Sequence, residues 1–301
     1  MLLITGATGF IGRVLTNKLI QSGKKIRLLI RPQQKTPQLQ KEVAFDVAIS
    51  GLHDLRGLQS AMRNVDTIIH LSTVENQPDY EGFERVDIQG TENLVAAAKI
   101  AGVKQIIFIS RIGADKNSSF PVFRAKALAE EFIMDSGIDF TIFRTTDVFG
   151  RNDNFTEKIS SAIQTSFLIL PIPAGDHIFL QPLWIEDLVS SIMIVLGSQK
   201  YRNKVLEIGG GEFFSLTKVI RLILQQNKKK RFLMQISPAY LRILNLWIRG
   251  TRDKFSYSNK WLDLLAIDRT CALDSLSKRF GIIPARFENQ LTYLQDSKST
   301  E

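Results

Sequence analysis

The chain has 301 residues, of which 44% are hydrophobic and 23% charged, and it carries a net charge of +9; this composition excludes intrinsic disorder as its main state. Its single cysteine, Cys271, excludes an internal disulfide framework and fits a reducing compartment. No window of about 18 uncharged apolar residues occurs, and Met1–Gly6 lacks the basic region of a signal peptide. We therefore expect a soluble or peripheral membrane protein of the cytoplasm or an organelle matrix.

The first 150 residues alternate strand-like apolar runs with helical periodicity. We expect strands, in chain order, over residues 1–5, 25–31, 43–49, 66–72, 104–110 and 139–144. We expect helices over residues 10–22, 55–64, 80–101 and 123–136. This alternation predicts an α/β fold of the Rossmann type, with a doubly wound parallel sheet and helices on both of its faces.

After Gly150 the alternation ends, and we expect a small, mostly helical C-terminal lobe. Its predicted elements are a helix over 186–197, a strand over 204–208, a helix from the N-cap Ser215 to about Gln226 and a helix that begins at Pro238. We therefore divide the chain into a dinucleotide-binding domain, residues 1–150, and a lobe for a substrate or partner, residues 151–301. Residues from about 180 to 210 are expected to return to the first domain.

A glycine-rich loop follows the first predicted strand and opens the first predicted helix. Its sequence is Gly6-Ala7-Thr8-Gly9-Phe10-Ile11-Gly12. Gly6 permits a tight turn, Gly9 lets the backbone approach a pyrophosphate at the helix N-terminus, and Gly12 permits close packing of helix on strand. Because the loop lies inside repeated βαβ units, it predicts a dinucleotide-binding site.

The end of the second predicted strand indicates which dinucleotide is bound. An NAD site usually has Asp or Glu there, which holds the ribose 2′-hydroxyl, whereas a cation suits a 2′-phosphate. Here the strand ends in Arg31, with Arg13 and Lys35 as further candidate cations. This favours NADP(H) over NAD(H); a solvent-exposed arginine without a ligand is the alternative.

Several motifs carry a family resemblance. They are Thr5–Gly12, His70–Ser72, Gly90–Leu94, Ile109–Ser110, Gln181–Asp187, Phe123–Glu131, Thr141–Arg144 and Val148–Gly150. Together they resemble the extended and atypical short-chain dehydrogenase/reductase superfamily. The last three narrow the resemblance to the NAD(P)H-binding branch that includes the Rossmann-fold accessory subunit of respiratory complex I and its bacterial relatives. The resemblance covers nearly the whole chain and is weakest after about residue 225.

The resemblance implies a catalytic set that is incomplete in this chain. Members of the superfamily use a Tyr four residues before a Lys, so that both lie on one helix face, and a Ser at the end of the preceding strand. The resemblance assigns these roles to Ser110 and Lys126, but Val122 occupies the position of the Tyr. No tyrosine occurs between Tyr80 and Tyr201. We therefore expect the usual proton donor to be absent.

The resemblance also implies further contacts with the cofactor. Besides the glycine loop and Arg31, the residues placed beside it are Leu52, Leu71, Ser72, Thr73, Ser110, Lys126 and Thr145. Two positions depart from the family pattern: Gly51 stands where an Asp often contacts adenine, and Thr145 stands where a Pro usually follows the arginine. The first departure weakens adenine binding, and the second places a hydroxyl near the nicotinamide.

The remaining polar residues give little sign of a second active site. His70 lies within an apolar strand and is predicted to be a hydrogen-bonded core residue. The spacing of the three histidines predicts no metal site. Asp187 is predicted to cap a helix, and Asp153 with Glu157 to lie at a solvated helix N-terminus.

The charge is concentrated near the C-terminus. Residues 218–260 contain eleven Lys and Arg residues and one acid, Asp253, and the rest of the chain is close to neutral. Within this region, the helix over 238–249 is apolar, including Trp247, apart from a narrow polar stripe. It either belongs to a buried lobe at the cofactor cleft or docks on a membrane or partner protein.

Localised positive charge indicates a membrane surface or an acidic protein as partner, and the alternative is a solvated basic face. Nucleic acid is disfavoured because no recognised motif for it occurs.

These observations favour an NADP(H)-binding protein that lacks the usual dehydrogenase reaction and uses the nucleotide as a structural or redox-sensing element while it engages a membrane-associated complex. The first alternative is an NADPH-dependent oxidoreductase, or an epimerase- or dehydratase-like enzyme, that uses Lys126 without a Tyr. The second is a nucleotide-sensing regulator that resembles the NmrA-type proteins.

Overall fold

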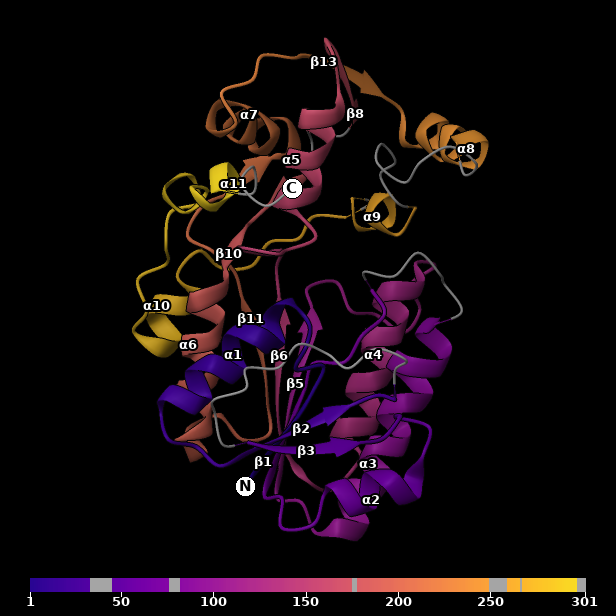
Figure 1. Cartoon of the computed structure of the whole chain (residues 1–301), viewed down its shortest axis with the longest axis vertical. Coiled ribbons are helices and arrows are strands. Elements are labelled where there is room, and N and C mark those ends of the chain that lie inside the picture. The colour runs from indigo at the N-terminus through magenta and orange to yellow at the C-terminus, as the bar shows by residue number, and fades with distance from the viewer. Residues whose placement is uncertain (33–44, 76–81, 175–177, 249–258, 266, 297–301) are drawn as a thin grey trace. The chain divides into compact units, whose positions relative to one another are not determined.

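The computed structural model describes residues 1–32, 45–75, 82–174, 178–248, 259–265 and 267–296 (Figure 1). The chain forms two compact units. The first consists of Met1–Thr145 with Val189–Glu207, and the second of Thr146–Leu188 with Ile208–Glu301.

The first unit is built on a seven-stranded sheet. Its strands are β1 (Leu2–Thr5), β2 (Ile26–Ile30), β3 (Asp46–Ile49), β4 (Thr67–His70), β5 (Gln105–Arg111), β6 (Asp139–Thr145) and β11 (Lys204–Ile208). The strand order is β11-β6-β5-β4-β1-β2-β3, and the pairs from β3 to β6 are all parallel. The Rossmann-type sheet predicted from the sequence is confirmed. The predicted strand over 43–49 is observed from Asp46, and its first two residues lie outside the described residues.

Helices cover both faces of this sheet (Figure 1). They are α1 (Phe10–Gln21), α2 (Leu55–Ala61), α3 (Gln89–Ala101), α4 (Pro121–Met134) and α6 (Ile185–Leu196), with a short 3₁₀ turn, η2, at Gln199–Tyr201. The central strands are apolar on both faces because both are covered; Leu3 and Ile4 of β1, for example, are fully buried. As predicted, α3 ends at Gly102, whose φ of +71° is the left-handed conformation that glycine adopts most easily.

The helix predicted over 80–101 has an irregular start, and its first two predicted residues lie outside the described residues. Residues Phe83–Ile88 form a π-helical turn, η1, before the regular helix α3 begins at Gln89. Such turns widen the helix by one residue and occur often at functional sites. Asp87 lies within this turn and is buried.

The second unit contains helices and short paired strands. The helices are α5 (Thr156–Thr165), α7 (Leu216–Gln226), α8 (Pro238–Ile248), α9 (Asn259–Leu264), α10 (Ser275–Phe280), η3 (Glu288–Gln290) and α11 (Tyr293–Asp296). The strands are β7 (Val148–Phe149), β8 (Ile169–Pro173), β9 (Phe179–Leu180), β10 (Leu183–Trp184), β12 (Phe214–Ser215) and β13 (Phe232–Ile236). They pair as β10 with β7, β12 with β9 and β13 with β8, and these pairs were not predicted from the sequence.

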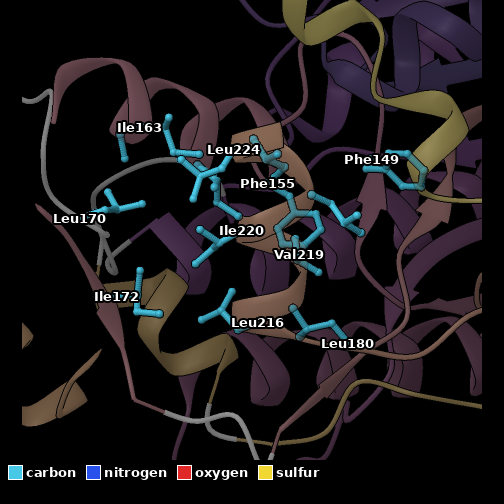
Figure 2. Packing of buried hydrophobic residues seen from close by; sticks show 14 of the residues in the cluster. Phe149, Phe155, Ile163, Leu170, Ile172, Leu180, Leu216, Val219, Ile220 and Leu224 are labelled. Carbon is cyan, nitrogen blue, oxygen red and sulfur yellow. The ribbon is translucent and has the colours of Figure 1, made fainter. Parts of the chain in front are cut away.

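One hydrophobic cluster holds the second unit together (Figure 2). Phe155 is the N-cap residue of α5, and Ile163 lies in its last turn. Val219 and Ile220 come from α7, and Leu170 comes from β8. The sequence places α7 correctly: Ser215 is its N-cap, and its side chain accepts a hydrogen bond from a backbone N–H in the first turn. The apolar face of α7 then packs into this cluster.

Two predictions about acidic residues in this unit are wrong. Asp153 does not lie at a solvated helix N-terminus; it is buried, and it accepts hydrogen bonds from the backbone N–H groups of Gly150 and Phe155. Asp187 does not cap α6, which begins at Ile185; its carboxylate accepts a hydrogen bond from the backbone N–H of Ala285. Burial raises the pKa of both carboxyl groups. Both side chains therefore connect backbone segments instead of facing solvent.

A buried ion pair in the second unit provides a test of this packing. Arg269 and Asp147 are 1% and 5% exposed, and Arg269 Nε donates to Asp147 Oδ2 at 2.8 Å. The change Arg269→Met removes the counter-ion of a buried carboxylate, so the free energy of unfolding in urea should fall by about 3–5 kcal/mol. Adding Asp147→Asn removes that charge and should recover part of the loss. A single variant as stable as the wild type would contradict this account.

Candidate functional site

The glycine loop lies at the carboxyl edge of the sheet, between β1 and α1. Because β1 lies between β4 and β2, this is the point where the strand order reverses, which is where sheets of this class bind ligands. Gly6 has a φ of +69°, and a Cβ there would lie 2.8 Å from the backbone of Leu71 and Ser72. A Cβ at Gly12 would lie 2.2 Å from the carbonyl oxygen of Gly6. Close backbone contacts therefore require glycine at both positions.

The N-terminus of α1 has the properties of an anion-binding site. Gly9 is its N-cap, is exposed and supplies no capping side chain, and the first turn, which includes Phe10 and Ile11, contains no acid. The N–H groups of this turn and the helix dipole favour a negative charge. Arg13 Nε donates to the carbonyl of Thr8 at 2.8 Å and so holds the loop against the helix. The loop, from Gly6 through Ala7 to Gly12, fits the pyrophosphate of a dinucleotide.

A hydrogen-bond chain fixes the neighbouring end of β4. The Thr91 hydroxyl donates to the carbonyl of Asp87 at 2.6 Å, so it accepts from His70 Nε2, which lies 3.0 Å away. His70 Nδ1 then accepts from the Thr5 hydroxyl at 2.7 Å, and the Thr5 oxygen accepts from the backbone N–H of Leu71. The chain requires a neutral His70 with its proton on Nε2. The prediction that His70 is a hydrogen-bonded core residue is confirmed.

Lys126 is buried and paired with a carboxylate. Its Nζ lies 3.4 Å from Asp87 Oδ1 and 5.2 Å from the centre of the Phe108 ring. Asp87 Oδ2 accepts from the backbone N–H of Val74, just beyond β4. The π-helical turn therefore brings an acid to the lysine that the sequence analysis selected, and Asp87 itself was missed. Val122, one turn before Lys126 on α4, is buried and has no group that could transfer a proton.

Ser110 takes part in a second buried polar group. Its hydroxyl donates a short hydrogen bond to Glu130 Oε1. The Glu130 carboxylate also accepts hydrogen bonds from Nε and Nη2 of Arg144. The hydrogen bonds with Glu130 raise the pKa of the Arg144 guanidinium. Glu130 was also missed, although it lies one helical turn after Lys126 and the i, i+4 spacing could have revealed it. The Ser110 carbonyl accepts from the Thr145 hydroxyl at 3.2 Å.

The other predicted contacts lie at the same edge of the first unit. Arg31 directly follows β2 and is exposed, whereas Lys35 lies outside the described residues. Leu71 and Ser72 directly follow β4, and Thr73 accepts from the backbone N–H of Glu75 through its hydroxyl. Leu52 lies between β3 and α2, where its carbonyl accepts from the side chain of Asn93.

Two negative findings apply to the described residues alone. Within the ranges given above, no group of His, Cys, Asp and Glu side chains is arranged to hold a metal ion. Over the same ranges, no helix has the length and apolar character needed to cross a bilayer.

Comparison with known proteins identifies the class of this fold and site. Residues 6–161 match a protein family described as NAD(P)H-binding. Since the match covers more than half of the chain, the protein belongs to this NAD(P)H-binding family.

Its relatives include photosystem II assembly factors and a subunit of mitochondrial NADH dehydrogenase. The chain is 32% identical over 148 residues to the photosystem II assembly factor Ycf39 of Cyanophora paradoxa, which covers 49% of this chain and 46% of that protein. The identity to Ycf39 of Guillardia theta is 23% over 304 residues, which covers 98% and 93%. The identity to the mitochondrial NADH dehydrogenase [ubiquinone] 1 alpha subcomplex subunit 9 of Arabidopsis thaliana is 26%, over 70% of this chain and 54% of that protein. The matches to the Cyanophora and Arabidopsis proteins thus span about half of each protein's length.

Solved structures share the fold. An NADPH-dependent quinone oxidoreductase, QOR2 of Escherichia coli in complex with NADPH, superposes with a TM-score of 0.76 at 22% identity, over 98% of this chain and 99% of that one.

The buried imidazole predicts a pH dependence of stability. Burial and the charge of Lys126 lower the pKa of His70 from 6.5 to about 3. The unfolded chain therefore takes up a proton that the folded chain excludes, so the contribution to stability is present above pH 6.5 and is lost as the pH falls towards about 3. Within this window the free energy of unfolding should fall by about 1.4 kcal/mol per pH unit. His70→Gln should remove this slope in urea titrations, and His53→Gln, at an exposed position, should keep it; equal slopes in both variants would refute the assignment.

The backbone contact at Gly12 predicts a specific loss of nucleotide binding. In Gly12→Ala the new methyl group collides with the Gly6 carbonyl, so the loop must shift away from the helix N-terminus. We expect a weaker affinity for NADPH by at least about tenfold, measured by fluorescence titration. Gly197→Ala is the matched control, because its Cβ would have no contact closer than 3.8 Å. Unchanged affinity in Gly12→Ala would exclude the loop as the binding site.

Proposed function

We propose that the protein binds NADP(H) at the glycine loop, holds it with little or no dehydrogenase turnover, and engages a membrane-associated protein complex, as a structural or redox-sensing nucleotide binder. The observation that carries this proposal is the pair of positions on α4. Lys126 is present, buried and paired with Asp87, and the position one turn earlier is the buried apolar Val122. Binding residues are therefore retained where the proton donor is missing.

Each predicted contact has a proposed role in binding. The N–H groups from Gly6 to Gly12 bind the pyrophosphate, and Lys126 donates to the ribose of the nicotinamide half. Arg31, helped by Arg13, binds the 2′-phosphate. The remaining contacts are Leu52, Leu71, Ser72, Thr73, Ser110 and Thr145. When bound, the nucleotide supplies a hydride donor or acceptor.

The polar side chains around Lys126 favour binding over proton transfer. In the superfamily, the charge of the lysine lowers the pKa of a neighbouring Tyr, which then moves the proton. Here Asp87 balances that charge at 3.4 Å, and Ser110 donates to Glu130. Val122 has no hydroxyl group that could donate a proton to a carbonyl substrate. These contacts support our proposal that Lys126 binds a ribose hydroxyl and that Val122 leaves the site without the usual proton donor.

The relatives support a protein complex as the partner. Two of them are named as an assembly factor of photosystem II and a subunit of NADH dehydrogenase. We propose that this chain, likewise, is a peripheral component or assembly factor of a membrane complex, located in the cytoplasm or an organelle matrix. A redox-sensing role further requires that the protein distinguish NADPH from NADP⁺ in affinity.

Arg31 predicts the choice of nucleotide. Arg31→Asp replaces the cation at the end of β2 by a carboxylate, which repels a 2′-phosphate and accepts from a 2′-hydroxyl. The affinity for NADPH should fall by about 10- to 100-fold, while the affinity for NADH stays equal or rises. Arg63→Asp, at another exposed position of the first unit, makes the same charge change and should alter neither affinity. A preference for NADH in the wild type would contradict the NADP(H) assignment.

A second candidate is an NADPH-dependent oxidoreductase that uses Lys126 without a Tyr, which the retention of a buried lysine at this position favours. We expect no NADPH oxidation with quinones or carbonyl compounds above that of Lys126→Met. Since removing one partner of a buried ion pair destabilises by about 3–5 kcal/mol, the variant should be combined with Asp87→Asn and its fold checked by thermal unfolding. Turnover in the wild type that the double variant abolishes, while it remains folded, would favour the enzyme.

A further inference from the structure

An exposed apolar edge lies in the second unit, at the start of the paired strands β8 and β13 (Figure 1). Phe167, Leu168 and Phe232 are 86%, 65% and 70% exposed. The parallel register places Phe232 beside Ile169, which is itself half exposed, and the backbone N–H of Phe232 donates to the carbonyl of Leu168 at 2.9 Å. The next pair in register is Leu170 with Leu233. Leu170 is fully buried, and Leu233 packs against the hydrophobic cluster. One face of this two-stranded sheet is therefore fixed by the core, while the other presents large apolar side chains to solvent.

Three lysines adjoin this apolar edge. Lys228, Lys229 and Lys230 are exposed and directly follow the C-cap of α7. Arg231 joins them to the edge, because its Nε donates to both the carbonyl and the hydroxyl of Ser166 at 3.1 Å. No acidic residue occurs in the sequence from 228 to 252. The apolar edge and the positive charge thus form one surface, which we call the β8–β13 edge: Phe167–Ile169 with Lys228–Phe232.

The chemistry of this surface selects its partner. Apolar side chains bordered by lysines match the interface of a bilayer that contains anionic lipids, where the apolar groups enter the headgroup boundary and the ammonium groups meet phosphates. A second copy of this chain would bring two lysine clusters together and be repelled. The apolar side chains also protrude at the end of a sheet, which suits mobile acyl chains.

We propose that the β8–β13 edge is a docking surface for an anionic lipid bilayer, with Phe167, Leu168 and Phe232 inserted at the headgroup boundary and Lys228–Lys230 on the lipid phosphates. This goes beyond the proposed function, since it requires neither a bound nucleotide nor a protein complex. The lipid contact would place the protein at a membrane before it meets its protein partner.

Co-sedimentation of the full chain with vesicles tests the proposal. The protein should bind vesicles of phosphatidylcholine with phosphatidylglycerol, in the presence or absence of NADPH, and should bind pure phosphatidylcholine weakly. Changing Lys228, Lys229 and Lys230 to Gln should weaken binding on the order of 100-fold, and high salt should weaken the wild type. The matched control changes three exposed lysines of the first unit, Lys18, Lys24 and Lys25, to Gln and should bind as the wild type does.

The apolar part is tested separately. Phe167→Ser with Phe232→Ser should weaken binding at least about tenfold, and Ile100→Ser with Ile283→Ser, at positions 70% and 87% exposed, should not. All variants lie on the surface, and thermal unfolding checks that they remain folded. No binding to anionic vesicles, or equal binding by the edge variants and their controls, would overturn the proposal; equal binding would assign the affinity to general charge, and no binding would assign the edge to a protein partner.

Discussion

The backbone of the glycine loop lies against the end of β4, and the geometry of the nucleotide site depends on this contact. Gly6 approaches the backbone of Leu71 and Ser72 so closely that a Cβ would lie 2.8 Å away. The Thr5 hydroxyl holds the same segment by accepting from the backbone N–H groups of Leu71 and Ser72. Because a Cβ at Gly12 would lie only 2.2 Å from the carbonyl oxygen of Gly6, the start of α1 is fixed relative to β1 and β4. The helix N-terminus is thereby preorganised for a pyrophosphate, and little ordering is left for the ligand to impose.

The polar side chains on α4 suggest how such a site changes from catalysis to binding. Lys126 and Glu130 lie one turn apart, and each is buried with a partner from another element. Buried charges persist only when they are paired, so these contacts fix the side chains more firmly than a solvent-exposed catalytic group would be fixed. With Val122 in place of a tyrosine, this position of the helix has no proton to give, and we propose that Lys126 binds a ribose instead. For this reason we favour a protein that binds the nucleotide without turnover over an enzyme that oxidises or reduces it.

The sequence revealed the parts of the molecule that local patterns determine. Buried parallel strands have apolar sequences, and glycines occur at close backbone contacts. Ser215 caps α7 as predicted. The sequence could not reveal contacts that depend on tertiary packing. The π-helical turn that brings Asp87 to Lys126 has no local signature. The pairing of β8 with β13 joins distant segments, and the burial of Asp153 follows from the packing around α5. A position near a helix start predicts a cap or a solvated carboxylate. The backbone segments that reach Asp153 and Asp187 are determined by tertiary packing.

The central claim is that the glycine loop holds NADP(H), and calorimetric titration of the purified wild-type chain with NADPH and with NADH tests it most directly. The account predicts saturable binding of NADPH, one nucleotide per chain, with a weaker affinity for NADH because of Arg31. Absence of heat with both nucleotides, from protein shown to be folded, would contradict it. The glycine loop would then be a structural turn that binds no ligand.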